Sequence, residues 1–193
     1  PYSMYMNVPG LKIILPTTAY DAKGLFKTAL RENNPVISFE HNLLGGAKCE
    51  VPEEEYTVPF GQAKIVRPGT DVTIVAMQKM VWDSLKAAEE LEKEGISVEI
   101  IDPRTLVPFD KDTVFESVKK TSKVLIVHED KVFSGFGAEL AATIGTELFQ
   151  HLDAPIQRVG SIFTPVGFHP VLEKAILPDA DRIYKAASDL LAY

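Results

Sequence analysis

Two neighbouring residues, His128 and Glu129, are the first candidates for chemistry because they end the apolar run KVLIVHE (123–129). In open α/β sheets, ligands bind at the carboxyl ends of the strands. A histidine and a carboxylate at such an edge can act as an acid–base pair. Neighbours on a strand point to opposite faces, however. An interface or loop-anchoring role is therefore the stronger interpretation of this pair.

A second candidate is Arg104, in the sequence Asp102-Pro103-Arg104-Thr105 that follows another apolar run. An arginine at a strand end can pair with a carboxylate or with a phosphate group. The alternative is an internal pair between Asp102 and Arg104 that only shapes the turn. The sequence favours this alternative slightly.

Gly135-Phe136-Gly137 precedes a predicted helix, and helix N-termini bind anions through their free N–H groups. A dinucleotide-binding loop needs a third glycine and an acidic residue further along, and both are missing. A tight turn that lets the helix pack on its strand is the stronger interpretation. Only Gly135 and Gly137 would support the interpretation of this chain as a stand-alone nucleotide-binding domain.

The remaining histidines and the cysteine give weaker signals. His41 follows a predicted strand, whereas His151 and His169 are expected at the surface or in loops. The four histidines do not show the spacing of metal ligands. Cys49 is the only cysteine, so it cannot form an internal disulfide, and no neighbouring histidine or asparagine marks it as a nucleophile.

Three short apolar runs must position the candidates at the strand ends: VTIVAM (72–77), SVEIID (97–102) and KVLIVHE (123–129). The spacers between them have helical periodicity, with Asp110 as an N-cap of the second. Alternation of this kind predicts an α/β fold, an open and mostly parallel sheet with helices on both faces. Shorter AKIV (63–66) is expected as an edge strand.

The N-terminal part reads as a strand–helix–strand piece: LKIIL (11–15), a helix from about Ala19 to Glu32 with Thr18 as N-cap, and VISFE (36–40). Two strands and one helix cannot bury their own faces, so we expect a partner or a missing segment to cover them. The domain prediction is residues 1–44 as the remnant of one domain, 45–60 as a linker and 61–193 as a second domain.

Composition narrows the class of protein. The net charge of −7 argues against a nucleic-acid or an anionic membrane partner. The sequence shows neither an apolar run of membrane-spanning length nor a signal peptide. Together with the lone cysteine, this predicts a cytoplasmic protein in a reducing compartment.

The motifs taken together resemble one family, the beta subunits of thiamine-diphosphate-dependent 2-oxo acid dehydrogenases, which include pyruvate, branched-chain and acetoin dehydrogenases. The resemblance covers essentially the whole chain in order, and DPRTLVP with the EEEYTVPFG segment look most like the acetoin or pyruvate branch. The segments that carry it are PGLKIILPTTAYDAKGLFKTALRENNPVISFEH (9–41), EVPEEEYTVPFGQA (50–63), GISVEIIDPRTLVPFD (95–110), ESVKKTSKVLIVHE (116–129), GFGAEL (135–140) and LDAPIQRVG (152–160).

The resemblance implies a partial pyrimidine-binding domain followed by a domain of the transketolase C-terminal type. It implies thiamine diphosphate with magnesium as the cofactor of the whole enzyme, held by residues that would lie upstream of Pro1, so this chain alone is expected to be inactive and to bind no cofactor. Implied partners are an alpha subunit, a second beta subunit and a lipoyl-bearing acyltransferase core. The carboxylate of Tyr193 is the expected contact with that core.

A structural monovalent cation is also implied by the resemblance. It would lie at the end of the first predicted helix, where free carbonyl groups suit a cation. The implied ligands are the backbone carbonyls of Ala29, Leu30 and Glu32 together with Asn34, although Glu32 stands where the family more often has aspartate. The alternative to an enzyme subunit is a pure assembly module, which holds subunits together without doing chemistry.

Overall fold

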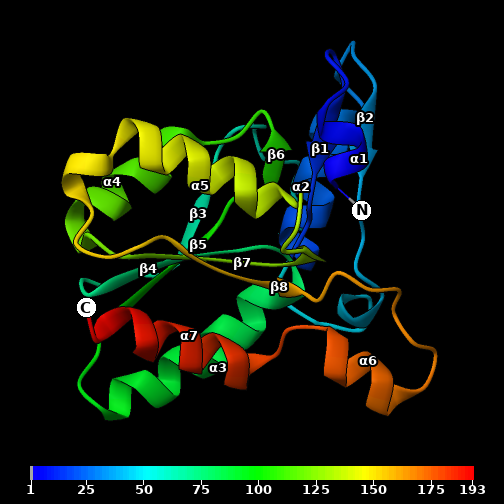
Figure 1. Cartoon of the computed structure of the whole chain (residues 1–193). Coiled ribbons are helices and arrows are strands. Elements are labelled where there is room, and N and C mark those ends of the chain that lie inside the picture. The colour runs from blue at the N-terminus through cyan, green and yellow to red at the C-terminus, as the bar shows by residue number, and fades with distance from the viewer. Residues whose placement is uncertain (1) are drawn as a thin grey trace.

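A five-stranded sheet forms the centre of the chain (Figure 1), here described from a computed structural model that covers residues 2–193. The strand order is β3-β5-β4-β7-β8, and every neighbouring pair is parallel except the edge pair β3·β5. The predicted fold class is therefore confirmed. The strands are β3 (Lys64–Arg67), β4 (Val72–Ala76), β5 (Val98–Asp102), β7 (Val124–Lys131) and β8 (Gln157–Ser161).

Two layers of helices cover this sheet. The helices α3 (Lys79–Lys93) and α7 (Ala180–Leu191) lie on one face, and α4 (Lys111–Thr121) and α5 (Phe136–Glu147) lie on the other (Figure 1). Asp110 caps α4 through Thr113 N–H, as predicted. Strands β4 and β5 are buried along their whole length, as expected for strands covered on both faces.

A second, three-stranded sheet joins the N-terminal segment to the rest of the chain. Its order is β2-β1-β6, formed by β1 (Lys12–Ile14), β2 (Val36–Ser38) and β6 (Thr105–Val107). The sequence pattern indicates a loop at β6, because three residues between two prolines carry no periodicity. The strand exists because β1 supplies an antiparallel partner from the other end of the sequence. Short helix α1 (Ser3–Met6) precedes this sheet.

Helix α2 (Ala19–Ala29) packs under the three-stranded sheet and ends three residues earlier than predicted. Thr18 caps it through Asp21 N–H. Gly24 allows close packing, because an added Cβ would overlap Val58. Val58 is buried there although it lies inside the predicted linker, so the end of that segment is packed against α2. The domain limits themselves stay a prediction.

The region 161–178, whose sequence is typical of a loop, contains helix α6 (Pro170–Ile176). Pro170 occupies its first turn and the His169 side chain accepts from Val171 N–H. Helix α6 has no buried residues. Its apolar positions recur at helical spacing, Val171 with Ala175 and Leu172 with Ile176, but the prolines of the region favour a loop. Two 3₁₀ turns complete the secondary structure of residues 2–193, η1 (Asn42–Leu44) and η2 (Phe149–His151).

Among the helices of the described part of the chain, none is long and apolar enough to cross a membrane.

Candidate functional site

His128 and Glu129 are adjacent residues in the second half of β7, but they make different contacts. His128 is fully buried. Its Nε2 accepts from Gly137 N–H at 3.1 Å, so Nδ1 carries the proton and donates to the Asp130 carbonyl at 3.0 Å. Burial lowers the pKa of His128, opposed by that carbonyl bond and the Asp130 charge. The imidazole is therefore a neutral structural group, and the two residues do not form an acid–base pair.

The glycine-rich turn surrounds this histidine. An added Cβ at Gly137 would overlap His128 Nε2, and one at Gly135 or Gly160 would lie about 3 Å from its Cε1 atom. The Gly137 N–H, which a phosphate would need, is already donated to the imidazole. The structure fits the interpretation of Gly135–Gly137 as a tight turn. In this turn the Gly137 N–H is not available to bind an anion.

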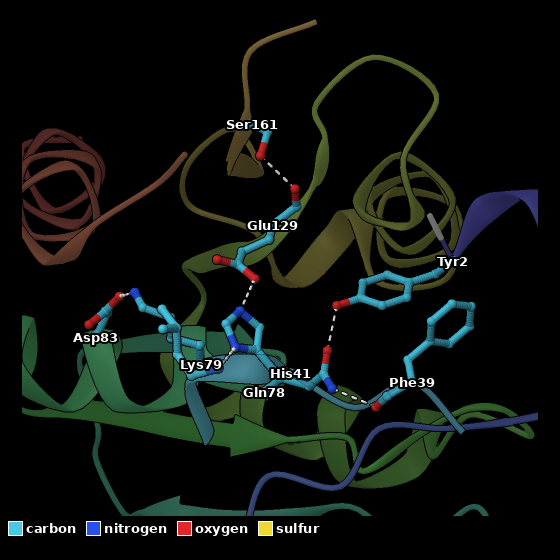
Figure 2. A network of polar contacts seen from close by, with 9 residues as sticks. Tyr2, Phe39, His41, Gln78, Lys79, Asp83, Glu129 and Ser161 are labelled. Atoms are coloured by element: carbon cyan, nitrogen blue, oxygen red, sulfur yellow. Dashed lines mark hydrogen bonds and ion pairs between the residues drawn. The ribbon is translucent and has the colours of Figure 1, made fainter. Parts of the chain in front are cut away.

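Glu129 instead pairs with His41, which lies 88 positions earlier in the chain. The distance from His41 Nε2 to Glu129 Oε2 is 2.5 Å, and both side chains are largely buried (Figure 2). His41 Nδ1 accepts from Leu43 N–H at 3.2 Å. Ser161 donates to the Glu129 carbonyl and fixes the strand end from β8. The pair anchors the N-terminal segment to the carboxyl edge of the large sheet.

A cavity of about 360 Å³ lies beside His41, between the start of α2 and residues 40–47. Phe26 and Thr18 also line it. Both ring nitrogens of His41 are engaged by Glu129 and Leu43 N–H. The imidazole thus has no free nitrogen for a ligand in this cavity, and acid–base chemistry there would first have to break an internal contact.

Gln78 makes a second link across the same edge (Figure 2). It lies between β4 and α3 with a left-handed backbone, φ +51°. Its Oε1 accepts from the Tyr2 hydroxyl at 2.7 Å, and its Nε2 donates to the Phe39 carbonyl at 2.6 Å. Burial raises the pKa of Tyr2, and the charges of Glu129 and Asp130 act in the same direction. Tyr2 therefore acts as a neutral donor.

The loop at Arg104 forms the third link. Asp102 accepts from the Arg104 backbone N–H at 2.9 Å, so the carboxylate does shape the turn. The Arg104 side chain does not return to Asp102 but reaches Asp21 on α2, with 2.9 Å between Nε and Oδ1. This contact is an ion pair only, because it does not meet the geometry of a hydrogen bond. The predicted internal Asp102–Arg104 side-chain pair is replaced by a contact between segments.

Sequence reasoning missed the partners in all three links, Tyr2, Asp21 and Gln78 among them. Each link includes a contact between residues separated by more than 75 positions, so no local spacing could have shown these partners. The sequence marks His41 only as a residue after a strand. The one usable signal is its position at a strand end, the same signal that selects Glu129.

The proposed cation ligands lie at the end of α2. The Ala29 carbonyl accepts from Glu32 N–H at 3.1 Å, and the Glu32 carboxylate pairs with Lys12. The Lys12 hydrogen bond is the main cause that lowers the pKa of Glu32. Leu30 and Asn34 are exposed. The Glu32 group that pairs with Lys12 is the carboxylate and not the implied backbone carbonyl, so the cation site stays a prediction.

The remaining residues that the sequence analysis considered take no part in these three links. Cys49 is exposed, and His151 lies in η2 at the surface. His169 caps α6. Tyr193 is 70% exposed at the end of the chain, so its surroundings neither support nor oppose a partner contact.

Residues 61–183 match the family described as "Transketolase, C-terminal domain". This chain belongs to that family. It is 42% identical over 190 residues to the acetoin:2,6-dichlorophenolindophenol oxidoreductase subunit beta of Bacillus subtilis, which covers 98% of this chain and 56% of the relative. It is 44% identical over 189 residues to the pyruvate dehydrogenase E1 component subunit beta of Rickettsia felis, covering 98% of this chain and 58% of the relative.

A solved structure described as "Split gene transketolase, inactive beta4 tetramer" has the same fold, with a TM-score of 0.85 and 25% identity. The match covers 98% of this chain and 61% of that chain. This member of the transketolase C-terminal domain family therefore spans a little over half the length of the curated relatives it matches.

The Gly135–Gly137 turn of this transketolase C-terminal domain chain does not fit the diphosphate of thiamine diphosphate, because it offers no free N–H at Gly137. Between Tyr2 and Tyr193, no group of three or more His, Cys, Asp and Glu side chains is placed to hold a metal ion. The glycine turn that resembles a phosphate cradle has its Gly137 N–H directed at His128. No catalytic step through the cofactor can be derived from these residues.

Proposed function

We propose that this chain is the C-terminal part of the beta subunit of a thiamine-diphosphate-dependent 2-oxo acid or acetoin dehydrogenase. One observation carries the proposal: identities of 42–44% extend over 98% of the chain to beta subunits of acetoin and pyruvate enzymes. A 2-oxoisovalerate dehydrogenase subunit beta is 40% identical over 193 residues. The substrate branch, pyruvate, acetoin or branched-chain 2-oxo acid, stays open.

The role of these residues in that subunit is assembly rather than chemistry. The polar groups at the strand ends are used in contacts within the chain. The chain also exposes a group of large apolar side chains around β8 and α6, and exposed patches of this kind mark surfaces that partners cover. They are Phe133, Ile162, Phe163, Val166, Phe168, Val171 and Leu172.

The proposed partners are an alpha subunit, a second beta subunit and a lipoyl-bearing acyltransferase core. The solved neighbour is a tetramer of beta chains, which supports self-association of this type of subunit. For the acyltransferase core we assign the exposed C-terminal residue Tyr193 as the contact. Residues 61–193 are the proposed unit of assembly, preceded by the remnant at 1–44 and the linker at 45–60.

Two experiments test the proposal. Sedimentation of the 193-residue chain should show a dimer or a larger oligomer, and a monomer at high concentration would contradict the assembly role. Calorimetry with thiamine diphosphate and magnesium should show no heat of binding.

The enzymatic activity proposed for the full-length subunit needs a separate assay. A full-length beta subunit that includes this sequence, combined with an alpha subunit, should oxidise one of pyruvate, acetoin or a branched-chain 2-oxo acid. Inactivity on all three classes by a correctly assembled complex would refute the enzyme assignment, whatever the oligomeric state of the shorter chain.

A further inference from the structure

Four buried polar side chains meet where the N-terminal segment packs on the end of β5. They are Thr17, Asp21, Asp102 and Arg104, with exposed fractions of 3%, 1%, 1% and 8%. We refer to them as the junction cluster. Two of them come from the β1–α2 region and two from the turn between β5 and β6. The cluster therefore spans the contact between the two sheets.

The backbone holds the two halves of the cluster together. Leu15 N–H donates to the Arg104 carbonyl at 2.7 Å, next to the antiparallel pairing of β1 with β6. Arg104 has a left-handed backbone, φ +58°, which is unfavourable for a residue with a Cβ. This conformation lets its carbonyl meet Leu15 while its side chain reaches Asp21.

The cluster has more hydrogen-bonding capacity than it uses. Thr17 Oγ1, Asp21 Oδ1 and Arg104 Nε are all buried without a partner of hydrogen-bond geometry. Thr17 nevertheless lies close enough to Asp102 to act on its carboxyl group. Two of these atoms, Asp21 Oδ1 and Arg104 Nε, are the two ends of the ion pair, so the cluster is held by charge more than by aligned hydrogen bonds.

The charges of the cluster do not balance. Arg104 supplies one positive charge and pairs with Asp21, so an ionised Asp102 would be a second, uncompensated negative charge in a buried site. Burial raises the pKa of Asp102 to about 7. The Asp21 charge adds to this, while Thr17, the Arg104 backbone N–H and the Arg104 charge oppose it.

We propose that Asp102 takes up a proton from solvent when the N-terminal segment docks, so that the junction between the two sheets is tighter in acid than in alkali. Protonation removes the uncompensated negative charge beside the Arg104–Asp21 pair, while a carboxyl oxygen of Asp102 still accepts from the Arg104 N–H. Loss of the proton to solvent leaves a buried charge and weakens the contact.

The contribution of Asp102 to stability changes with pH in the direction opposite to that of most carboxyl groups. The folded chain binds the Asp102 proton more tightly than the unfolded chain does, since the pKa rises from 3.8 to about 7. Its contribution to stability is complete below pH 3.8 and is lost as the pH rises through about 7. Linkage then predicts that the folding equilibrium constant falls by about tenfold between pH 6 and pH 8 from this group alone.

Urea unfolding of the 193-residue chain at pH 6, 7 and 8 tests the proposal. The Asp102→Asn variant keeps the shape of the side chain and cannot ionise, so it should lack the tenfold fall that the unchanged chain shows. Glu99→Gln is the matched control, because Glu99 is equally buried on the same strand but pairs with Lys120, which helps to lower its pKa. It should be less stable than the unchanged chain and keep the same dependence on pH between 6 and 8.

Two further measurements keep the test decisive if a variant does not fold. The carboxyl carbon of Asp102 in the unchanged chain, followed by NMR, should titrate near pH 7; titration below pH 5 would overturn the proposal. Hydrogen exchange should show loosening at residues 11–17 between pH 6 and pH 8, measured against β4 in the same sample. Equal loosening of both regions, or the same pH dependence in Asp102→Asn and the unchanged chain, would also overturn it.

Discussion

The interior of the five-stranded sheet and its junction with the N-terminal segment differ in how far they rely on polar contacts. The interior consists of two apolar layers, one on each face, in which β4, β5 and β7 contribute side chains that are fully buried. At the junction Tyr2, Ile13 and Leu15 join one of these apolar layers, and directed polar contacts are added to it: His41 with Glu129, Tyr2 with Gln78 and the junction cluster. Apolar burial is additive and tolerant of position, whereas each polar contact depends on one geometry. The two regions should therefore respond differently to substitution.

The largest effect is expected in the interior. Leu125 lies near the start of β7, which runs between β4 and β8, and is fully buried. Leu125→Ala should lower the free energy of unfolding by about 2–5 kcal/mol, because it removes buried apolar surface and leaves a cavity. Urea denaturation measures this, and the whole chain should unfold together. A loss below about 1 kcal/mol would mean that the site collapses around the smaller side chain.

A smaller but still substantial effect is expected at the turn around His128. Gly137→Ala places a Cβ against His128 Nε2 and 2.9 Å from its Cδ2, and the buried ring has no room to move. We expect a loss of roughly 1–3 kcal/mol from this overpacking. Gly46→Ala is the matched control, because nothing lies within 4 Å of its added Cβ. Equal stabilities of the two variants in thermal unfolding would contradict the packing described for the turn.

The junction should respond more weakly and more locally. Glu129→Ala removes the acceptor of His41 Nε2, and the expected cost is about 1 kcal/mol for one largely buried polar contact. Hydrogen exchange should increase around residues 36–44 before it increases in β4 or β5. Glu40→Ala, an exposed neighbour of His41, should change stability by less than about 0.5 kcal/mol. Uniform loosening of the whole chain in Glu129→Ala would remove the distinction between the two regions.

The smallest effect is expected at an ion pair on the surface, which belongs to neither region. Lys185 and Asp189 on α7 are 2.7 Å apart at helical spacing, and both are exposed. Lys185→Ala should change the free energy of unfolding by about 0.3–0.5 kcal/mol. The change should disappear in about 1 M salt, where exposed charges are screened. A loss as large as that of Glu129→Ala would show that burial is not what makes the junction contacts stronger.

The difference between the apolar interior and the polar contacts of the junction also explains which parts of the fold could be predicted from the sequence. Apolar periodicity identifies the strands of the large sheet and the helices α3, α4, α5 and α7, because each of these buries a face. Local spacing also identifies the caps at Thr18 and Asp110. These features depend on residues within a few positions of one another.

The junction could not be predicted in the same way. Strand β6 has three residues and becomes a strand only because β1 lies beside it. Glu129 is recognisable as a strand-end residue, but the sequence offers His128 beside it as a partner rather than the distant His41. In each case the deciding contact is between segments that are far apart in the sequence, and periodicity contains no information about it.

Strand β6 has a consequence for the order of events during protein synthesis. Strand β1 cannot complete its sheet until residues 105–107 have emerged from the ribosome. Thr105 follows Ile14 by about 90 positions, and at roughly 5–20 residues per second this corresponds to a delay of roughly 5–20 seconds. Throughout that interval one edge of β1 is unpaired, and unpaired strand edges promote aggregation. The nascent N-terminal segment is thus the part of this chain that most needs protection by a chaperone while translation continues.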